Sequence, residues 1–339
     1  MENMLEVRDL HKYYGAFHAV RGISFDVARG EILGFLGPNG AGKTTTMKIA
    51  VGFMTMSSGS IMVDNHDVVQ DSMAVRRIIG YLPEHAPLYE DMTVNEYLSF
   101  IADVRGLRGK ERAERMEYVI GVCALQTKRK SGIKTLSKGY RQRVGLAQAI
   151  IHDPKLVILD EPTVGLDPNQ IIEIRNLIHE IGVKNTVVLS SHILGEVEAT
   201  CSRVVIINEG AIVANGTAAQ LETELGESPT MHVGLGAPVE TVKPVFEALP
   251  LVKSVTSAAA TDTGSHFSLE LNEHEGAAQS IVNLAQSKGW DLHELVRPKR
   301  TLEDVFKSLT VPGAAATTAK VNAPTEDSAN DNSDDGVDA

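Results

Sequence analysis

Four short segments of the chain contain residues whose types and spacing suit chemistry on a phosphate. They are GPNGAGKTT at residues 37–45, LSKGYRQR at 136–143, LVILDEPTVGLDP at 156–168 and LSSH at 189–192. Glycines, a lysine, hydroxyls, two adjacent carboxylates and a histidine are the groups needed to hold a polyphosphate, bind Mg²⁺ and activate a water molecule. Together the four segments predict a nucleoside triphosphatase.

The first segment fits the pattern G-x-x-x-x-G-K-[ST] and directly follows an apolar run at residues 32–36. A strand, a loop and a helix in this order form the context in which the pattern binds phosphate. Small residues let the backbone curl so that successive N–H groups point inward, backed by the positive end of the helix. We expect Lys43 to reach the β- and γ-phosphates and the Thr44 hydroxyl to ligate Mg²⁺. The loop residues expected to bind the nucleotide are Gly37, Pro38, Asn39, Gly40, Ala41, Gly42, Lys43, Thr44 and Thr45.

Two acidic residues, Asp160 and Glu161, directly follow a second apolar run at residues 156–159. Ligands of open α/β sheets bind at the carboxyl ends of parallel strands, which is where these carboxylates are expected. Asp160 is placed to hold Mg²⁺, and Glu161 is the natural group to polarise a water that attacks the γ-phosphate. An ordinary charged strand end is the alternative, and the phosphate-binding loop earlier in the chain disfavours it.

These motifs resemble those of the ATPase subunit of ATP-binding cassette (ABC) transporters, and the resemblance covers about residues 5–221. It implies that LSKGY is the family's signature loop and that His192 is a catalytic histidine that contacts the γ-phosphate, beside Lys43 and Glu161. It also implies an aromatic platform for adenine, for which Tyr14 is the expected residue and Tyr13 the alternative. The cofactors implied are ATP and Mg²⁺.

In this family the signature loop contacts the γ-phosphate bound by a second subunit rather than by its own phosphate loop. Ser137 and the N–H group of Gly139 suit that contact, at the start of a helix expected at residues 140–151. In the family, the strand expected here at residues 156–159 is called the Walker B strand. Asp167, in the loop after it, is also expected at the nucleotide. Because the chain has one phosphate loop and one signature, we expect a dimer, either of identical chains or with a similar ATPase.

Two positions depart from the usual pattern of the family. Lys138 and Tyr140 replace residues of the common LSGGQ sequence, and Glu84 stands where a glutamine normally follows the strand expected at residues 79–82. A carboxylate can only accept hydrogen bonds when ionised, so Glu84 is expected near Mg²⁺ or the attacking water, with a greater dependence on Mg²⁺. The chain resembles a sub-class of bacterial exporter ATPases that includes the gliding-motility type, in which the same variants occur.

The composition of the chain bears on its partners and its location. With 44 acidic against 32 basic residues, the net charge of −12 is poorly suited to following a phosphate backbone, so no nucleic-acid partner is expected. No apolar run approaches the roughly 18 residues needed to span a bilayer, and no signal peptide is indicated. We therefore expect a peripheral location at the cytoplasmic face of the cell membrane, with a separate permease subunit spanning it.

The expected fold class is α/β, with a P-loop ABC-type core over residues 1–225. An antiparallel β patch at residues 5–10 and 23–27 precedes the phosphate loop, and a helical subdomain is expected at about residues 85–152. Within that subdomain, two amphipathic helices are expected at residues 94–104 and 112–122. The core is thus predicted to bring the phosphate loop, the signature helix and the Walker B strand close to one another.

After the core, the pattern of residues 226–311 predicts the order β-α-β-β-α-β, followed by a helix at residues 302–309. That order is typical of a small ferredoxin-like α+β domain, to which we assign a regulatory or dimer-contact role, with a small-molecule sensor as the alternative. Residues 312–339 are rich in acidic and small polar residues and are predicted to be a disordered acidic tail.

The sequence therefore predicts an ATP-hydrolysing subunit of a membrane exporter, in which closure of an ATP-bound dimer drives translocation by a separate permease. A soluble ABC-type ATPase that remodels a protein or nucleoprotein complex is the competing hypothesis. A sensor that binds nucleotide without hydrolysing it is disfavoured because Asp160 and Glu161 are both present.

Overall fold

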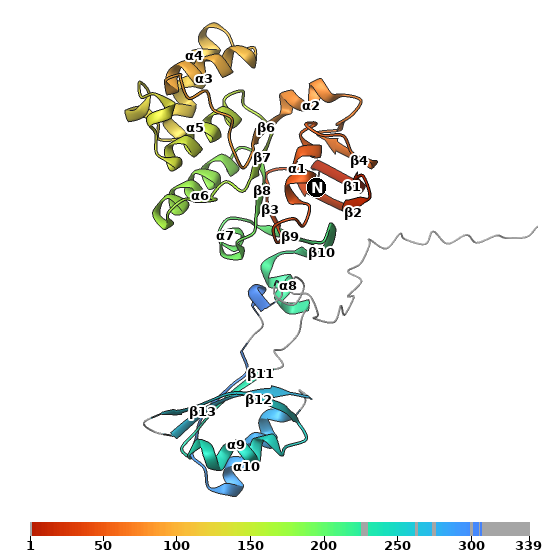
Figure 1. The fold of residues 1–339 in the computed structure, drawn as a ribbon, viewed down its shortest axis with the longest axis vertical. Helices are drawn as coiled ribbons and strands as arrows, with labels where there is room; N and C mark the ends of the chain where they lie inside the picture. The colour runs from red at the N-terminus through yellow and green to blue at the C-terminus, as the bar shows by residue number, and fades with distance from the viewer. Residues whose placement is uncertain are drawn as a thin grey trace, which may run out of the picture.

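The computed structural model describes residues 2–224, 230–261, 264–272, 276–298, 301–304 and 306. Residues up to 224 form two sheets with their covering helices, and residues 230–298 form a third sheet with two helices (Figure 1). The predicted acidic tail at residues 312–339 lies outside the described residues. No helix within the described ranges combines the length and the apolar character that a bilayer-spanning segment requires.

A six-stranded sheet with the strand order β10-β9-β3-β8-β7-β6 forms the centre of the amino-terminal part. All neighbours pair in parallel except β10, which is antiparallel to β9. Strands β7 and β8 are buried along their whole length, as expected of parallel strands covered on both faces. The strands are β3 (Ile32–Leu36), β6 (Ile79–Leu82), β7 (Leu156–Asp160), β8 (Thr186–Ser191), β9 (Arg203–Asn208) and β10 (Ala211–Gly216).

The predicted antiparallel patch is confirmed, as the sheet β2-β1-β4-β5. Its apolar face packs with helix α1 (Lys43–Ala50) and one face of the central sheet in a common core, in which the rings of Phe25 and Phe35 lie 5.2 Å apart. This packing holds the phosphate loop, between β3 and α1, against both sheets. The strands are β1 (Asn3–Tyr14), β2 (Phe17–Ala28), β4 (Ser58–Val63) and β5 (His66–Asp67).

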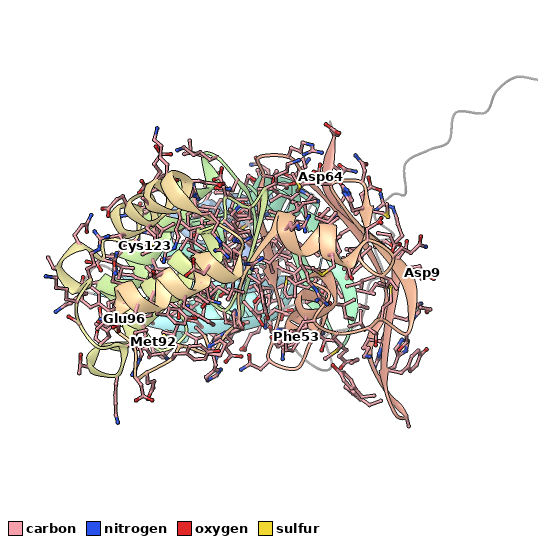
Figure 2. The ribbon with its side chains drawn as sticks, turned by 90° about the horizontal axis from the view of Figure 1, so that it is seen from above. Asp9, Phe53, Asp64, Met92, Glu96 and Cys123 are labelled. Atoms are coloured by element: carbon pink, nitrogen blue, oxygen red, sulfur yellow. The ribbon has the colours of Figure 1, made fainter. Side chains whose placement is uncertain are left out.

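The helical subdomain lies at the end of the molecule opposite the antiparallel sheet, as the positions of Glu96 and Asp9 show in Figure 2. The helix predicted at residues 94–104 is confirmed, whereas the next begins at Gly109 instead of residue 112 and the signature helix at Lys138 instead of residue 140. That helix starts earlier because Ser137 caps it, accepting a hydrogen bond from the Tyr140 N–H group. The helices of the subdomain are α3 (Val94–Val104), α4 (Gly109–Val122) and α5 (Lys138–Ile150), whereas α2 (Ser72–Ile78) packs beside β5 and β6.

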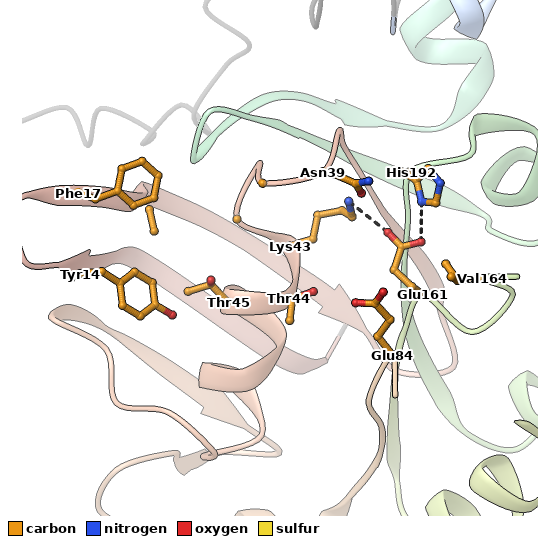
Figure 3. A pocket seen from close by; sticks show the side chains of 13 residues that line it. Tyr14, Phe17, Asn39, Lys43, Thr44, Thr45, Glu84, Glu161, Val164 and His192 are labelled. Carbon is orange, nitrogen blue, oxygen red and sulfur yellow. Dashed lines mark hydrogen bonds and ion pairs between the residues drawn. The ribbon is translucent and has the colours of Figure 1, made fainter. Parts of the chain in front are cut away.

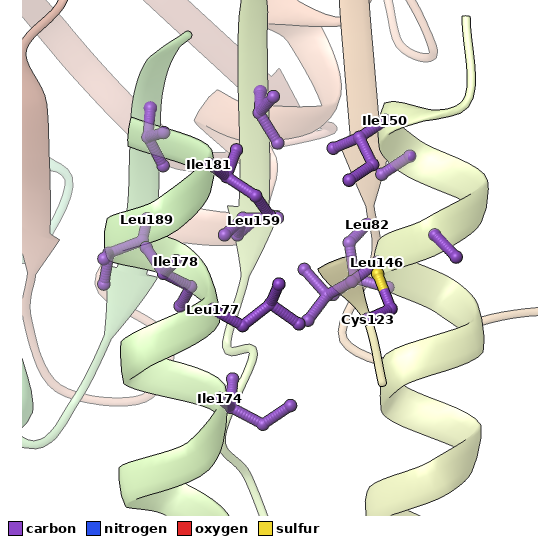
Figure 4. Close-up of a cluster of buried hydrophobic side chains, with 14 of the residues drawn as sticks. Leu82, Cys123, Leu146, Ile150, Leu159, Ile174, Leu177, Ile178, Ile181 and Leu189 are labelled. Carbon is purple, nitrogen blue, oxygen red and sulfur yellow. The ribbon is translucent and has the colours of Figure 1, made fainter. Parts of the chain in front are cut away.

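Helices α5 and α6 (Pro168–Gly182) cover one face of the central sheet. Leu146 of α5 and Ile178 of α6 meet Leu159 of β7 and Leu189 of β8 in a buried apolar cluster (Figure 4). Two short helices, α7 (Leu194–Glu198) and α8 (Ala218–Glu224), complete this part of the chain. The cluster ties the signature helix directly to the Walker B strand.

The elements of the carboxyl-terminal part follow the predicted order, and its sheet has the order β12-β13-β11-β14. Phe246 and Phe267 lie at the centre of its own core. Of the helix predicted at residues 302–309, residues 302–304 and 306 are helical, and the others lie outside the described residues. The elements are β11 (Thr230–Leu235), α9 (Val239–Glu247), β12 (Val252–Thr261), β13 (Gly264–Leu271), α10 (Ala277–Lys288) and β14 (Leu292–Val296).

The contact between β6 and α5 leads to a prediction about stability. A Cβ atom at Gly80 would lie 2.1 Å from the carbonyl oxygen of Ala149, so Gly80→Ala must push the strand and the helix apart. We expect the free energy of unfolding to fall by about 1–3 kcal/mol, as for other overpacked cores, measured by urea denaturation. Gly121→Ala is the control, because its Cβ atom meets open space in α4 and should raise stability by up to about 1 kcal/mol. Equal stability of Gly80→Ala and the wild type would contradict the prediction.

Candidate functional site

A pocket of about 590 Å³ opens beside the phosphate loop, at the carboxyl ends of the central strands (Figure 3). Its volume is in the range of ligand pockets. The residues that line it are Tyr14, Phe17, Ala19, Asn39, Gly40, Gly42, Lys43, Thr44, Thr45, Glu84, Glu161, Val164 and His192. Predicted residues from five separate segments of the sequence therefore meet in one place.

The phosphate loop requires glycine where the backbone comes close to other segments. A Cβ atom at Gly37 would lie 2.3 Å from the carbonyl oxygen of Ile207, and one at Gly42 would lie 2.9 Å from that of Ala19. Gly42 also has a φ of 107°, in the region that side chains disfavour. As the N-cap of α1 it offers no side chain, so the first N–H groups of the helix are left for an anion in the pocket.

Lys43 lies inside the curve of the loop, with only 5% of its surface exposed. Its Nζ atom donates hydrogen bonds to the carbonyl oxygens of Gly37, at 2.7 Å, and Pro38, at 3.2 Å. The same atom lies 3.2 Å from Oε1 of Glu161. Gly37, Pro38 and Ala41 do not line the pocket: the first two hold Lys43 through their carbonyl groups, and Ala41 is buried.

Asp160 is 1% exposed and ends strand β7. Its Oδ1 atom accepts hydrogen bonds from the hydroxyls of Ser190, at 2.7 Å, and Thr44, at 3.1 Å. Its Oδ2 atom is buried and has no hydrogen-bond partner among the described residues. Burial raises the pKa of this carboxyl above its ordinary value, and the charges of Glu161 and Glu84 raise it further.

These oxygens fit a hard divalent cation. An unpartnered carboxylate oxygen beside the Thr44 hydroxyl, with Glu84 at the same pocket, is a donor set of the kind that Mg²⁺ takes, completed by water and phosphate. The described part of the chain contains no group of three or more histidine, cysteine and acidic side chains able to hold a metal ion without other ligands. The donor set is therefore suited to a cation that arrives with its substrate.

Glu161 and His192 form a hydrogen bond of 2.8 Å between Oε2 and Nδ1. Glu161 is 6% exposed and has a φ of 51°, in the left-handed region, which costs a residue other than glycine about 1–3 kcal/mol. Its N–H group donates to the carbonyl and hydroxyl oxygens of Ser190. Strand β8 thus holds the Glu161 backbone in a conformation that directs its carboxylate between Lys43 and His192 (Figure 3).

The outer edge of the pocket is aromatic. Tyr14 and Phe17 face each other across the β1–β2 hairpin, and both line the pocket with about half their surface or more exposed, 45% and 61%. Tyr13 instead stacks on His18, with ring centroids 3.9 Å apart, so the geometry favours Tyr14 as the adenine platform. Sequence reasoning missed Phe17, although its place opposite Tyr14 in a short hairpin was a usable signal.

Ser137, Gly139 and Asp167 line a second pocket, of about 480 Å³, and not the first. Asp167 caps α6, accepting a hydrogen bond from the Gln170 N–H group. A Cβ atom at Gly139 would lie 2.8 Å from the Gln170 side chain, so Gln170, which the sequence analysis did not indicate, packs against the signature loop. The signature residues of this chain are therefore not part of its own phosphate pocket.

The burial of Asp160 leads to a prediction about stability and pH. Asp160→Asn keeps an acceptor for both hydroxyls and removes the buried charge, so we expect the unfolding midpoint at neutral pH to rise by about 2–4 °C. The raised pKa means that the ionised carboxylate destabilises the fold above that pKa and that the cost disappears as the pH falls through it. Thermal unfolding of both proteins across pH measures this; a gain in stability that grows toward acid would contradict it.

Comparison with known proteins agrees with this geometry. The profile of the family described as "ABC transporter" matches residues 20–164. The "Linearmycin resistance ATP-binding protein LnrL" of Bacillus subtilis (strain 168) is 33% identical over 310 residues, covering 91% of this chain and 98% of that protein. The "Bacitracin transport ATP-binding protein BcrA" of Bacillus licheniformis is 37% identical over 215 residues, 63% of this chain and 69% of that protein.

A solved structure described as "Structure of ATP binding subunit of ABC transporter" superposes with a TM-score of 0.61 at 34% identity, covering 66% of this chain and 93% of that one. The similarity to LnrL extends over nearly the full length of both chains. The structure also brings the phosphate loop, Glu161 and His192 into one pocket, and Asp160 accepts a hydrogen bond from Thr44 of that loop. The chain therefore belongs to the ABC transporter family, as an ATP-binding subunit that hydrolyses ATP.

Proposed function

We propose that this chain is one of two ATP-hydrolysing subunits of a membrane exporter, bound at the cytoplasmic face of the membrane to a separate permease. The observation that carries the catalytic part is the arrangement of Lys43, Glu161 and His192 beside the unpartnered oxygen of Asp160. The direction of transport is supported by relatives whose names refer to linearmycin resistance and bacitracin transport. Export of an antibiotic-like molecule is consistent with both names.

ATP binding changes the partners of Lys43. Its ammonium group, 3.2 Å from Glu161 in this structure, exchanges the carboxylate for γ-phosphate oxygens, with the N–H groups of the phosphate loop as additional donors. Thr44, Asp160 and Glu84 would hold Mg²⁺, which neutralises charge on the phosphate oxygens when bound. The adenine ring stacks against Tyr14, with Phe17 beside it. Stacking on a flat aromatic ring gives affinity for any base.

Glu161 then serves as the base that polarises the attacking water. When Lys43 moves to the phosphate, the Oε1 atom of Glu161 becomes available as an acceptor, while Oε2 of Glu161 remains hydrogen-bonded to His192. When its ring is protonated, both nitrogens of His192 are donors, so that Nδ1 holds the carboxylate in place and the second ring nitrogen can donate to the γ-phosphate. The burial of Glu161, at 6% exposure, strengthens these electrostatic contacts by excluding bulk water.

Completion of the site requires a second ATPase subunit. Ser137, Gly139 and Asp167 line a different pocket from Lys43, so they can meet a γ-phosphate only across an interface. Two chains arranged head to tail would enclose two ATP molecules, each between the phosphate loop of one chain and the signature loop of the other. Hydrolysis removes the shared γ-phosphate contacts and the dimer opens.

The loop that begins at Glu84 connects the pocket to the surface that we assign to the permease. Glu84 lines the pocket, and the loop continues to Tyr89, which is 52% exposed and packs against Phe100, ring centroids 5.5 Å apart. Exposed aromatic residues in contact with one another are typical of a protein-binding surface. A permease segment bound here would respond to movement of Glu84 as ATP binds and leaves.

We also propose that residues 1–225 form the nucleotide-binding domain and residues 226–311 a ferredoxin-like accessory domain with a regulatory or dimer-contact role. The sheet order β12-β13-β11-β14 supports this type of fold. Beyond this sheet, Leu302 is fully buried in the same core as Leu221 of α8 and Val197 of α7. The described residues that flank the accessory sheet in the sequence therefore pack in the same core as α7, the helix that follows His192, which supports a regulatory role.

Charge reversal in the Glu84 loop tests the proposed coupling. Glu90→Lys/Asp91→Lys changes two exposed side chains outside the pocket, so we expect ATP hydrolysis by the isolated chain to stay within about twofold, while permease binding and transport are lost. The matched control is Glu111→Lys/Glu114→Lys, the same charge change on exposed positions of α4. Normal transport by the Glu90/Asp91 variant would refute this route of coupling.

Glu161→Gln tests the catalytic assignment. The amide keeps the size of the side chain but cannot act as a base, so we expect turnover to fall by about 10²-fold or more while ATP binding remains. Phosphate release measures turnover, and size-exclusion chromatography with ATP and Mg²⁺ is expected to show a stable dimer. Lys43→Ala, which loses phosphate binding, should stay monomeric under the same conditions. Full turnover by Glu161→Gln would exclude Glu161 as the base.

The same trapped variant identifies the partner. Tagged Glu161→Gln, loaded with ATP and Mg²⁺ and purified from native membranes in mild detergent, is expected to retain a polytopic membrane protein in stoichiometric amount. Retention of soluble protein or nucleic acid alone would instead place the chain among ATPases that remodel other complexes.

A further inference from the structure

A half-buried glutamate outside the nucleotide pocket connects the two segments that carry the catalytic pair. Glu196, on helix α7, does not line the pocket. Its Oε2 atom accepts hydrogen bonds from the hydroxyls of Thr163, at 2.6 Å, and Ser191, at 3.0 Å. Both hydroxyl residues are nearly inaccessible to solvent, Thr163 at 7% and Ser191 at 1% exposure. One carboxylate oxygen therefore joins two loops that are far apart in the sequence.

The two hydroxyl residues are immediate neighbours of the catalytic pair. Thr163 lies two residues after Glu161, and Ser191 directly precedes His192. On the pocket side, Glu161 and His192 are joined by their own hydrogen bond of 2.8 Å. The Thr163–Glu196–Ser191 bridge thus repeats the same connection behind the pocket, so that each catalytic residue is held from two directions.

The second carboxylate oxygen of Glu196 shows that this group is placed for more than packing. Oε1 is buried and has no hydrogen-bond partner among the described residues, which is costly for a carboxylate. Arg175 of α6 lines the same small cavity as Glu196 and Thr163. A carboxylate with one buried, unsatisfied oxygen is retained where its geometry serves the site.

We propose that Glu196 is a positioning residue for ATP hydrolysis: it holds the loop after Glu161 against the end of β8 and so keeps Glu161 and His192 aligned with the γ-phosphate. The proposal rests on the proposed roles of Glu161 and His192. The Glu196 carboxylate binds the Thr163 and Ser191 hydroxyls, whereas the phosphate loop is bound through the Ser191 carbonyl, which accepts from the Gly37 N–H group. Loss of the carboxylate should therefore affect the chemical step and leave nucleotide binding unchanged. A misplacement of about 1 Å at a catalytic group can cost on the order of 10²-fold in rate.

Three substitutions test the bridge by steady-state ATPase kinetics of the full chain. Glu196→Ala is expected to lower kcat by about 10- to 100-fold with KM for ATP within about twofold. Glu196→Gln retains an oxygen that can accept from both hydroxyls, so it should recover most of the lost kcat. Glu198→Ala is the matched control, since Glu198 is exposed on the same helix and its loss should leave kcat unchanged.

A double-mutant cycle separates positioning from a general loosening of α7. If the bridge acts as a unit, Thr163→Val and Glu196→Ala should each lower kcat, and the double variant should be no worse than the single variant with the larger loss. Multiplicative losses, or a loss in Glu196→Ala that Glu196→Gln does not recover, would overturn the proposal. A thermal unfolding midpoint is recorded for each variant, so that loss of folded protein is not read as loss of rate.

The Glu161→Gln background distinguishes failure of this proposal from failure of the proposed function. Glu161→Gln/Glu196→Ala should bind ATP as tightly as Glu161→Gln. Should Glu161→Gln lack turnover while Glu196→Ala retains wild-type kcat, the base remains Glu161 and only the positioning role of Glu196 is wrong. Should Glu161→Gln keep full turnover, the catalytic assignment itself is wrong and the bridge has no base to position.

Discussion

The register between the parallel strands β7 and β8 is the constraint on which the site depends. Asp160 pairs with Ser190 at the carboxyl end of these strands, and the residues that follow, Glu161 and His192, form the hydrogen bond at the pocket. A slip of one residue would turn every side chain of a strand to the opposite face. The buried apolar residues on both faces of β7 and β8 prevent that slip, so the core sets the catalytic geometry.

This arrangement concentrates unfavourable free energy in one place. Asp160 is a nearly inaccessible carboxylate with an unpartnered oxygen, and Glu161 has a left-handed backbone. Glu196 adds a second carboxylate with an unpaired oxygen behind the pocket. Such costs of a few kcal/mol each persist only where surrounding packing compensates for them. Here the apolar cluster between α5, α6 and the central strands supplies the compensation.

Two residues of the pocket are also followed by segments that lead away from it. Glu84 joins the pocket to the exposed aromatic residues Tyr89 and Phe100, and His192 is followed by α7, whose Val197 lies in the same core as Leu302. Ser137 and Asp167 cap α5 and α6 and line a pocket other than that of the chain's own phosphate loop. The geometry of one chain is therefore suited to sensing a second chain and a membrane partner through short, rigid segments.

The amino-acid sequence by itself determined the groups that have local rules. The glycine spacing of the phosphate loop, the paired carboxylates after an apolar strand and the order of helices and strands all follow from neighbouring residues. The sequence left Tyr13 as the alternative to Tyr14 and did not indicate Gln170 or Glu196, because adjacent hairpin residues look alike and the other contacts join distant segments. Only the tertiary structure shows these contacts, since stacking of Tyr13 on His18 and the Thr163–Glu196–Ser191 bridge exist only after β1, β2, β7 and β8 have packed.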